Sequence, residues 1–340
     1  MSEKKITIAI PTYNRNHILR QSLVHLLPQL TEECQVLIVD NCSDVPVAET
    51  LAEILAGFPS VACRIVRNRV NIGGNANILR CFELSDSDWV WLLGDDDQVF
   101  SDAIDTILRH IDQYSSSTVI NFYFQELPYV RQETFATLGI DEFVEKMDWF
   151  DNVMFGSCSV FRVDNILGQM RIGLQYAYAS APHVALLLAS IGEKGVGCFS
   201  RDSVIVGHTV FTHAQTGSPV TVALGLFMLL EIPMRPATRR ALAHKIWAMR
   251  DNWNSQWLIF SQVLFESLRL NDAEWAVYIY QQIVSRSSYY RPSVSRRIEA
   301  RFYLFLLHFP RATYWILSVL YRLMRRRNLG SLYVDRLARM

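Results

Sequence analysis

The sequence has no Cys-x-x-Cys pair and no cluster of cysteine and histidine with the spacing of a zinc site, although it contains six cysteines. A disulfide framework or a zinc ribbon is therefore not expected in a chain of this length. We expect the cysteines to be reduced and mostly buried.

The N-terminus lacks the long apolar run of a secretion signal. Its apolar stretch covers residues 6–10 and stops at Pro11, which makes it shorter than the hydrophobic region of a signal peptide. We therefore expect the protein to stay on the cytoplasmic side. A fixed-period internal repeat is also missing, so the sequence does not support a solenoid.

Proline, glycine and net charge are low as well. The chain has 11 Pro and 15 Gly in 340 residues, and half of it is apolar, which excludes disorder and collagen-like repeats as its main state. The 33 basic and 33 acidic side chains cancel, but residues 1–220 hold 15 basic against 26 acidic and residues 221–340 hold 18 against 7. This asymmetry is the first indication of function.

What the sequence does contain, up to about residue 200, is an alternation of short apolar runs and amphipathic stretches. It predicts strands at residues 6–10, 35–40, 63–68, 89–94, 118–124 and 158–162. Helices are predicted between them at residues 15–30, 45–57, 74–84 and 101–113. The order βαβαβαβ indicates an α/β fold with a mostly parallel sheet flanked by helices.

The second part of the chain has few turn residues and many Leu, Trp, Tyr, Phe and Arg. Helices are expected at residues 221–232, 237–269, 272–286, 293–309 and 311–327. We therefore predict an α/β domain over residues 1–219 and an all-α C-terminal extension over residues 220–340.

Polar residues follow four of the predicted strands, where α/β sheets bind their ligands. They are Pro11-Thr12-Tyr13-Asn14, Asp40-Asn41-Cys42-Ser43, Asn71-Ile72-Gly73 and Gly94-Asp95-Asp96-Asp97. An aromatic face and a single acceptor at strand ends suit a flat pyrimidine.

Three consecutive carboxylates, Asp95, Asp96 and Asp97, repel one another and need an explanation. They could form a solvated turn, with Asp102 capping the next helix. They could instead hold a divalent cation that also bridges a diphosphate, because Mg²⁺ and Mn²⁺ prefer hard oxygen ligands.

The four motifs, in this order and spacing, resemble the nucleotide-binding half of the family 2 glycosyltransferases of GT-A fold, over about residues 4–218. The resemblance implies that Pro11, Thr12, Tyr13 and Asp40 hold the base of a nucleotide-diphospho-sugar, Tyr13 by packing on the ring and Asp40 by accepting from a ring N–H. The alternatives are an ordinary loop aromatic for Tyr13 and a helix cap for Asp40.

The resemblance also implies that Asn71, Gly73 and Asn77 bracket the ribose and the phosphates. A plain turn followed by a capped helix explains the same three residues equally well.

The family's usual acidic motif is Asp-x-Asp-Asp, and Gly94 stands where its first Asp would be if the last two are matched. The resemblance then implies that Asp95 and Asp97 lie nearest a Mn²⁺ or Mg²⁺ ion and the diphosphate. Asp96 is expected to contact the ribose or to lie behind the metal ligands.

In many relatives a Glu-Asp pair at a helix start supplies the base that deprotonates the acceptor. Here Pro182-His183 stands at that place. An imidazole can do the same work near neutral pH, so His183 is the predicted base, with Asp148 and Asp151 as alternatives. A histidine that only caps or packs is the other interpretation.

Residues 210–218 resemble the Tyr-Arg-x-His-x-x-Ser segment that closes the domain in relatives, where the histidine is commonly a metal ligand. His213 is the expected ligand, ahead of His208. Phe211 replaces the usual Arg. Which cation, if any, offsets the charge of the diphosphate at this place is therefore an open question.

Two apolar, aromatic stretches at residues 302–309 and 314–321 precede a basic cluster of Arg322, Arg325, Arg326 and Arg327. His308, Pro310 and Arg311 interrupt the run, so a membrane-spanning helix is not expected. An interfacial pair of helices on anionic lipid fits better, and a core-packed hairpin or a dimer interface is the alternative. A nucleic-acid partner is not expected.

These features together predict an inverting, metal-dependent glycosyltransferase. It would move a sugar from a nucleotide-diphospho-sugar to a hydroxyl of a glycan or lipid-linked glycan, in bacterial O-antigen or capsule assembly, as a peripheral protein on the cytoplasmic face of the inner membrane. A nucleotidylyltransferase would need a Gly-rich, Arg- or Lys-bearing loop after the first strand, which residues 11–16 lack. A sugar-nucleotide-binding or membrane scaffold protein with altered catalysis is the remaining alternative.

Overall fold

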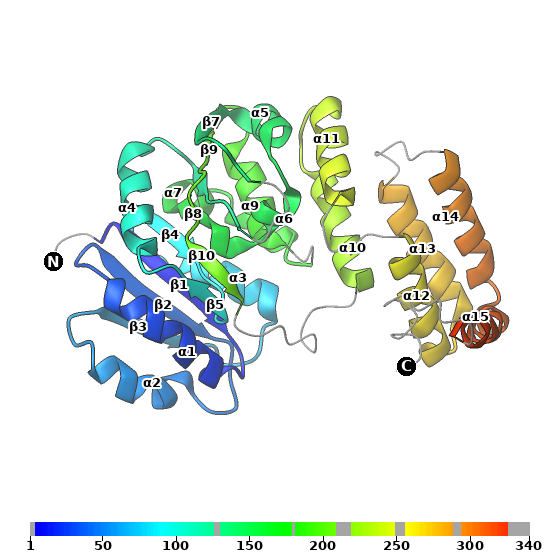
Figure 1. Cartoon of the computed structure of the whole chain (residues 1–340), viewed down its shortest axis with the longest axis horizontal. Helices are drawn as coiled ribbons and strands as arrows, with labels where there is room; N and C mark the ends of the chain where they lie inside the picture. Colours follow the sequence, from blue (N-terminus) through cyan, green and yellow to red (C-terminus); the bar gives the residue numbers. More distant parts are fainter. Residues whose placement is uncertain are drawn as a thin grey trace. The chain divides into compact units, whose positions relative to one another are not determined.

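The computed structural model describes residues 4–125, 130–178, 181–208, 219–248, 256–287 and 294–325. The chain divides into two compact units (Figure 1). The first holds residues 1–217 and 225–251, and the second holds residues 218–224 and 252–340.

An eight-stranded sheet forms the centre of the first unit. Its order is β3 (Ala62–Arg67), β2 (Cys34–Asp40), β1 (Ile6–Thr12), β4 (Trp89–Leu92), β8 (Ser159–Arg162), β6 (Val119–Asn121), β9 (Val196–Phe199) and β7 (Phe135–Leu138). Strands β3, β2, β1 and β4 are mutually parallel, and so are β6 and β9, while β8 and β7 run antiparallel to their neighbours. The predicted fold class, a mostly parallel sheet flanked by helices, is confirmed.

Helices cover both faces of this sheet, which is why its central strands are apolar at nearly every position. One face packs on α1 (Asn16–Leu26), α2 (Val47–Ala56) and α4 (Ala103–Gln113). The other face packs on α3 (Gly74–Glu83), which also contacts α7 (Val163–Leu167), α8 (Met170–Gln175) and α9 (Pro182–Ile191). Burial on both sides fixes the strand order that brings the loops together.

The loops that follow β1, β2 and β4 meet at one edge of the sheet. The N–H of Asn41 donates to the carbonyl of Thr12 at 2.9 Å, and the N–H of Leu93 donates to the carbonyl of Ala9 at 3.0 Å. A two-stranded antiparallel ribbon of β5 (Asp97–Val99) and β10 (Ile205–His208) follows directly from the third loop. The polar motifs at residues 11–14, 40–43 and 94–97 therefore lie at a common edge.

Further helices complete the first unit. They are η1 (Leu27–Gln29), α5 (Gly139–Lys146), α6 (Phe150–Met154), η2 (Gly156–Cys158), part of α10 (Pro219–Met228), η3 (Leu229–Glu231) and α11 (Pro236–Trp247). The prediction of one helix over residues 237–269 is wrong, because α11 ends at Trp247 and a new helix begins at Gln256. The apolar pattern on both sides of this break made the two helices look like one.

The second unit is helical. It contains α12 (Gln256–Leu270), α13 (Ala273–Ser287), α14 (Val294–Leu307) and α15 (Pro310–Arg325). Aromatic side chains form its core, and the rings of Phe260 and Tyr303 stack with centroids 4.5 Å apart. Among the described helices, none has both the length and the apolar composition needed to cross a bilayer.

Candidate functional site

Arg15 connects two of the three carboxylates. Its Nη1 lies 2.7 Å from Asp95 Oδ1 and its Nη2 lies 2.5 Å from Asp96 Oδ2. The hydroxyl of Thr12 donates to the other oxygen of Asp95 at 2.7 Å. The cation that the cluster needs is therefore supplied in this structure by an arginine of the loop after β1.

Burial sets the electrostatics of this pair. It raises the pKa of Asp95 to about 6, although Arg15 and Thr12 both act to lower it. Burial also acts against the charge of Arg15, but the nearby carboxylates outweigh it and raise the pKa of the guanidinium. Desolvation thus outweighs the stabilisation that Arg15 and Thr12 give to the charged form of Asp95.

Asp97 points in another direction, into the protein. The hydroxyl of Ser157 donates to Asp97 Oδ2 and accepts from the N–H of Gly94 at 2.9 Å. Asp97 is the first residue of β5, and its register partner in β10 is His208. The three carboxylates are therefore divided between two sets of partners.

Gly94 is required by this arrangement. A Cβ at residue 94 would overlap Oδ2 of Asp97, closer than real contacts allow. A first Asp in the manner of the Asp-x-Asp-Asp pattern would displace the carboxylate that Ser157 holds. Gly94 thus leaves room for the carboxylate of Asp97 where it stands.

The predicted metal ligands are only partly within the structure. Asp95 and Asp97 are described, while His213 falls among residues 209–218, which lie outside the described residues. Within the described part of the chain, no three side chains of His, Cys, Asp or Glu are placed to hold a metal ion. The backbone register that puts residue 208 opposite Asp97 keeps His208 as the alternative.

Asp40 lies at the end of β2 and is 1% exposed. Its carboxylate accepts from the N–H of Ser43 at 2.8 Å, from the N–H of Val47 at 3.3 Å and from Nη1 of Arg67 at 2.6 Å. These bonds lower its pKa even though burial acts to raise it. In this structure Asp40 makes the bonds expected of a cap for α2.

The β1 loop is braced against the β2 loop beside Tyr13. Asn14 adopts a left-handed conformation with φ of 53°, which asparagine tolerates well. Its N–H donates to Ser43 Oγ at 2.9 Å, and the N–H of Asp44 donates to its side-chain oxygen at 2.7 Å. Tyr13 and Pro11 are partly exposed on this braced loop.

The asparagines near α3 hold the loops in place. Asn77 is 2% exposed; it accepts from Asn68 at 2.8 Å and donates to the carbonyl of Val39 at 2.9 Å. Asn71 accepts from Asn41 and from the N–H of Gly73, both at 2.8 Å. Gly73 has φ of 84° and is exposed at the N-terminus of α3, so its backbone faces the edge where the other loops meet.

His183 lies in the first turn of α9 and is buried. Its Nε2 is 2.7 Å from the carbonyl of Met154, which requires Nε2 to carry the proton. Nδ1 is buried and has no hydrogen-bond partner among the described residues. Burial lowers the pKa of His183 to about 4, so the imidazole is neutral at physiological pH.

One turn links His183 to the carboxylates. Met154 ends α6, and Ser157 follows it in η2, so the segment that bonds His183 also bonds Asp97. Of the two alternative bases, Asp148 lies 2.6 Å from Nε of the buried Arg131, and Asp151 lies in α6.

Sequence reasoning missed Arg15 and Ser157 as site residues. Arg15 was within the first motif, and the repulsion among three carboxylates was a signal that a cation had to be near. Ser157 gave no signal, because it is 60 positions from Asp97 and reaches it only through the folding of β8 beside β4.

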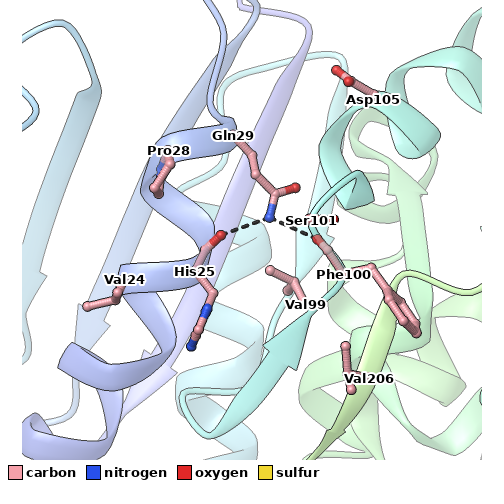
Figure 2. A pocket seen from close by; sticks show the side chains of 9 residues that line it. All are labelled: Val24, His25, Pro28, Gln29, Val99, Phe100, Ser101, Asp105 and Val206. Atoms are coloured by element: carbon pink, nitrogen blue, oxygen red, sulfur yellow. Dashed lines mark hydrogen bonds between the residues drawn. The ribbon is translucent and has the colours of Figure 1, made fainter.

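A separate pocket of about 650 Å³ lies between the end of α1, the β5–β10 ribbon and the start of α4. Figure 2 shows the side-chain amide of Gln29 bridging the carbonyls of His25 and Phe100, each at 2.8 Å. None of the predicted site residues lines this pocket. Gln29 thus braces α1 against the start of α4.

Comparison with known proteins gives the family of the first part of the chain. Residues 7–164 match the family model "Glycosyl transferase family 2". This stretch is a glycosyltransferase family 2 domain. The resemblance predicted from the four motifs is confirmed for this domain, which contains all of the predicted site except His183 and His213.

Curated relatives match about a third of the chain. Abequosyltransferase RfbV of Salmonella typhimurium is 27% identical over 109 residues, which is 32% of this chain and 32% of the relative. An uncharacterized glycosyltransferase of Haemophilus influenzae is 29% identical over 119 residues, 35% of this chain and 37% of the relative. The chain thus spans about a third of the length of the curated relatives it matches.

Solved structures share the fold over most of the chain. S. aureus TarS 1–349 in complex with UDP-GlcNAc has a TM-score of 0.56 at 13% identity and covers 84% of this chain and 89% of its own. Mannosyltransferase PcManGT from Pyrobaculum calidifontis, in complex with GDP-Man and Mn²⁺, has a TM-score of 0.50 at 12% identity, over 90% and 86% of the two chains. These similarities establish the GT-A-like fold of the family 2 domain.

Proposed function

We propose that the protein is an inverting, metal-dependent glycosyltransferase that moves a sugar from a nucleotide-diphospho-sugar to an acceptor hydroxyl. The observation that carries the proposal is the carboxylate cluster of a family 2 domain, Asp95 to Asp97, at the edge where the β1, β2 and β4 loops meet. Transfer would form a bond between the acceptor oxygen and the anomeric carbon and break the bond from that carbon to the phosphate oxygen.

The donor would lie along this edge. The braced loop of Pro11, Thr12 and Tyr13 would face the base, with Asp40 fixing the loop that follows β2. Gly73 offers its backbone to the phosphates, and Asn71 and Asn77 hold that loop in shape. Asp96, which is partly exposed, would face the ribose. TarS and PcManGT were solved with nucleotide-sugars bound, which supports this class of donor.

The edge offers carboxylate oxygens of the kind that Mn²⁺ or Mg²⁺ prefers, although in this structure Asp95 is bonded to Arg15 and Thr12 and Asp97 is bonded to Ser157. Asp95 and Asp97 would hold the divalent cation together with His213, or with His208 opposite Asp97. The ion supplies positive charge to the departing diphosphate. Arg15, which bridges Asp95 and Asp96, would also help to neutralise the negative charge of the diphosphate.

His183 is the proposed base. Its Nε2 is committed to Met154, so Nδ1, which is buried in this structure, is the atom that would have to accept the proton of the acceptor hydroxyl. If His183 has this role, His183→Ala lowers turnover by roughly a hundredfold or more and leaves donor affinity near wild type. Unchanged turnover of His183→Ala would show that His183 is not the base, and Asp148 or Asp151 would then be the candidates.

Removal of one metal ligand tests the whole proposal. UDP and GDP, with Mn²⁺ or with excess chelator, would be screened for thermal stabilisation, and release of nucleoside diphosphate from the matching sugar donors would be measured. Asp97→Asn should abolish transfer and most metal-dependent nucleotide binding but keep the fold, because the amide oxygen can still accept from Ser157. Full activity of this variant, or full activity in chelator, would refute the proposal, and binding without any turnover would favour a scaffold role.

We further propose assembly of a surface polysaccharide on a lipid carrier as the setting. Support comes from the partial similarity to RfbV and from the basic, aromatic C-terminal region. The protein would then work as a peripheral protein on the cytoplasmic face of the membrane. A dimer formed through the C-terminal helices is the alternative use of that region.

A further inference from the structure

Helix α14 exposes a continuous apolar stripe. Four stripe residues, Val294, Ile298, Phe302 and Phe305, are spaced by four, four and three positions and share one face of α14. Phe309 follows in the turn after the helix, and each of the five residues is between 55% and 67% exposed. A different face, with Ala300, Tyr303 and Leu307, packs into the core of the second unit. The stripe is therefore not the face through which α14 packs into the core of the second unit.

Basic side chains run along one side of the stripe. Arg297, Arg301 and His308 are exposed and fall next to it by helical periodicity. The single acidic residue of α14, Glu299, lies away from this side and accepts from the hydroxyl of Tyr303 at 2.9 Å. From residue 294 to the end, the sequence holds ten arginines against two acidic residues.

The next helix, α15, also exposes an aromatic and a basic side chain. Trp315 at the start of α15 is 67% exposed, and Arg311 beside it is exposed as well. Exposed aromatics next to arginines, with no acidic side chain between residues 300 and 334, are typical of a surface that meets the headgroups of anionic lipid.

We propose that the α14 stripe is a membrane-docking surface, with its apolar side chains at the headgroup boundary and Arg297 and Arg301 on lipid phosphates. The inference deepens the proposed function, since it rests on an acceptor carried by lipid. It adds the α14 stripe to the arginines after residue 321 as a site of membrane attachment.

A second copy of the chain is a poorer occupant of the stripe. Two antiparallel α14 helices packed through their stripes would place the Arg297–Arg301 side of one copy against the same side of the other. Like charges would then face each other across the contact. Anionic lipid complements the same charges.

Flotation of the full chain with vesicles tests the inference, using phosphatidylglycerol-containing and pure phosphatidylcholine vesicles at low salt. The paired change Phe302→Ser with Phe305→Ser should lower the partition constant on anionic vesicles at least tenfold. Arg297→Gln should lower it by about fivefold, and Arg301→Gln by a similar factor. Matched controls are Tyr278→Ser, an aromatic of α13 that is 59% exposed away from the stripe, and Arg269→Gln, an exposed arginine of α12.

Controls that bind as the wild type, with loss only in the stripe variants, would support the docking surface. A wild-type protein that ignores anionic vesicles, or stripe variants that bind as well as the controls, would overturn it. A wild-type dimer that the Phe302→Ser and Phe305→Ser changes split would assign the stripe to a second copy. Nucleotide-dependent thermal stabilisation with Mn²⁺ is measured on the same samples, so that failure of the proposed function is seen separately.

Discussion

Gly94 shows how a single missing side chain shapes the site. Because a Cβ at this position overlaps the carboxylate of Asp97, Gly94→Ala should displace that carboxylate and lower turnover by roughly tenfold or more. Gly168→Ala is the matched control, since its Cβ would meet only ordinary contacts at 3.4 Å and beyond. The test is the rate at which Gly94→Ala and Gly168→Ala release nucleoside diphosphate. Equal rates would show that Gly94 has no steric role.

The buried imidazole of His183 predicts a specific acid sensitivity. Its pKa is lowered from 6.5 to about 4 in the folded protein, so the unfolded chain binds a proton more readily as the pH falls. The free energy of unfolding should therefore be intact above about pH 6.5 and decline by up to roughly 3 kcal/mol towards pH 4.

Urea unfolding at pH 6.5 and pH 4.5 measures this effect. In the His183→Gln variant, which cannot titrate, the difference between the two pH values should be smaller than in the wild type. An identical pH dependence in both proteins would show that His183 is not buried in the neutral form.

For single residues, the sequence predicted which charges need a partner better than it predicted which partner each residue contacts. The need of three carboxylates for a cation was evident, but whether an arginine or a metal supplies it depends on where Arg15 lies. For Asp40 both interpretations, base contact and helix cap, were available from the sequence. The bonds to Ser43 and Val47 appear only when the loop closes.

At the scale of elements, the end of β6 is held by one buried arginine. Arg131 donates to the carbonyls of Asn121 at 2.8 Å and Ser200 at 2.6 Å, pairs with Asp148, and lies 5.0 Å from the centre of the Phe199 ring. It thereby joins β6, the residue after β9 and the segment before α6.

Arg131→Ala should destabilise the protein by about 3–5 kcal/mol, because it leaves a carboxylate and two carbonyls without their donor. Arg109→Ala removes the 63% exposed partner of Asp202 and should cost less than about 1 kcal/mol. Denaturant midpoints of the two variants test the contrast, and similar losses would contradict it.

Elements within strongly apolar or amphipathic stretches were predictable, including the short strands β4, β6 and β8, and four other short strands were not. Strands β1 to β4 and helices α1 to α4 were expected from apolar runs and amphipathic stretches, and they form the half of the sheet that carries the donor motifs. Strands β5, β7, β9 and β10 have three or four residues each, too few to show an alternation. Their pairing is decided by tertiary contacts.

For the molecule as a whole, the opposite charges of the two parts of the chain predict a salt-dependent location. Replacement of Arg322, Arg325, Arg326 and Arg327 by Gln should weaken binding to anionic vesicles, and raised salt should mimic the change in the wild type. Turnover on a soluble acceptor analogue should survive, because these residues follow the family 2 domain. Vesicle binding that is indifferent to salt would show that the charge asymmetry has another cause.

The six free cysteines provide a way to label the proposed donor site. Four of them are buried, and only Cys42 and Cys63 are partly exposed. Burial raises the pKa of Cys63 to about 11, which keeps it as the unreactive thiol at neutral pH. A maleimide dye should therefore label Cys42 first, on the loop between Asp40 and Ser43, and its fluorescence would report nucleotide entry without any engineered cysteine.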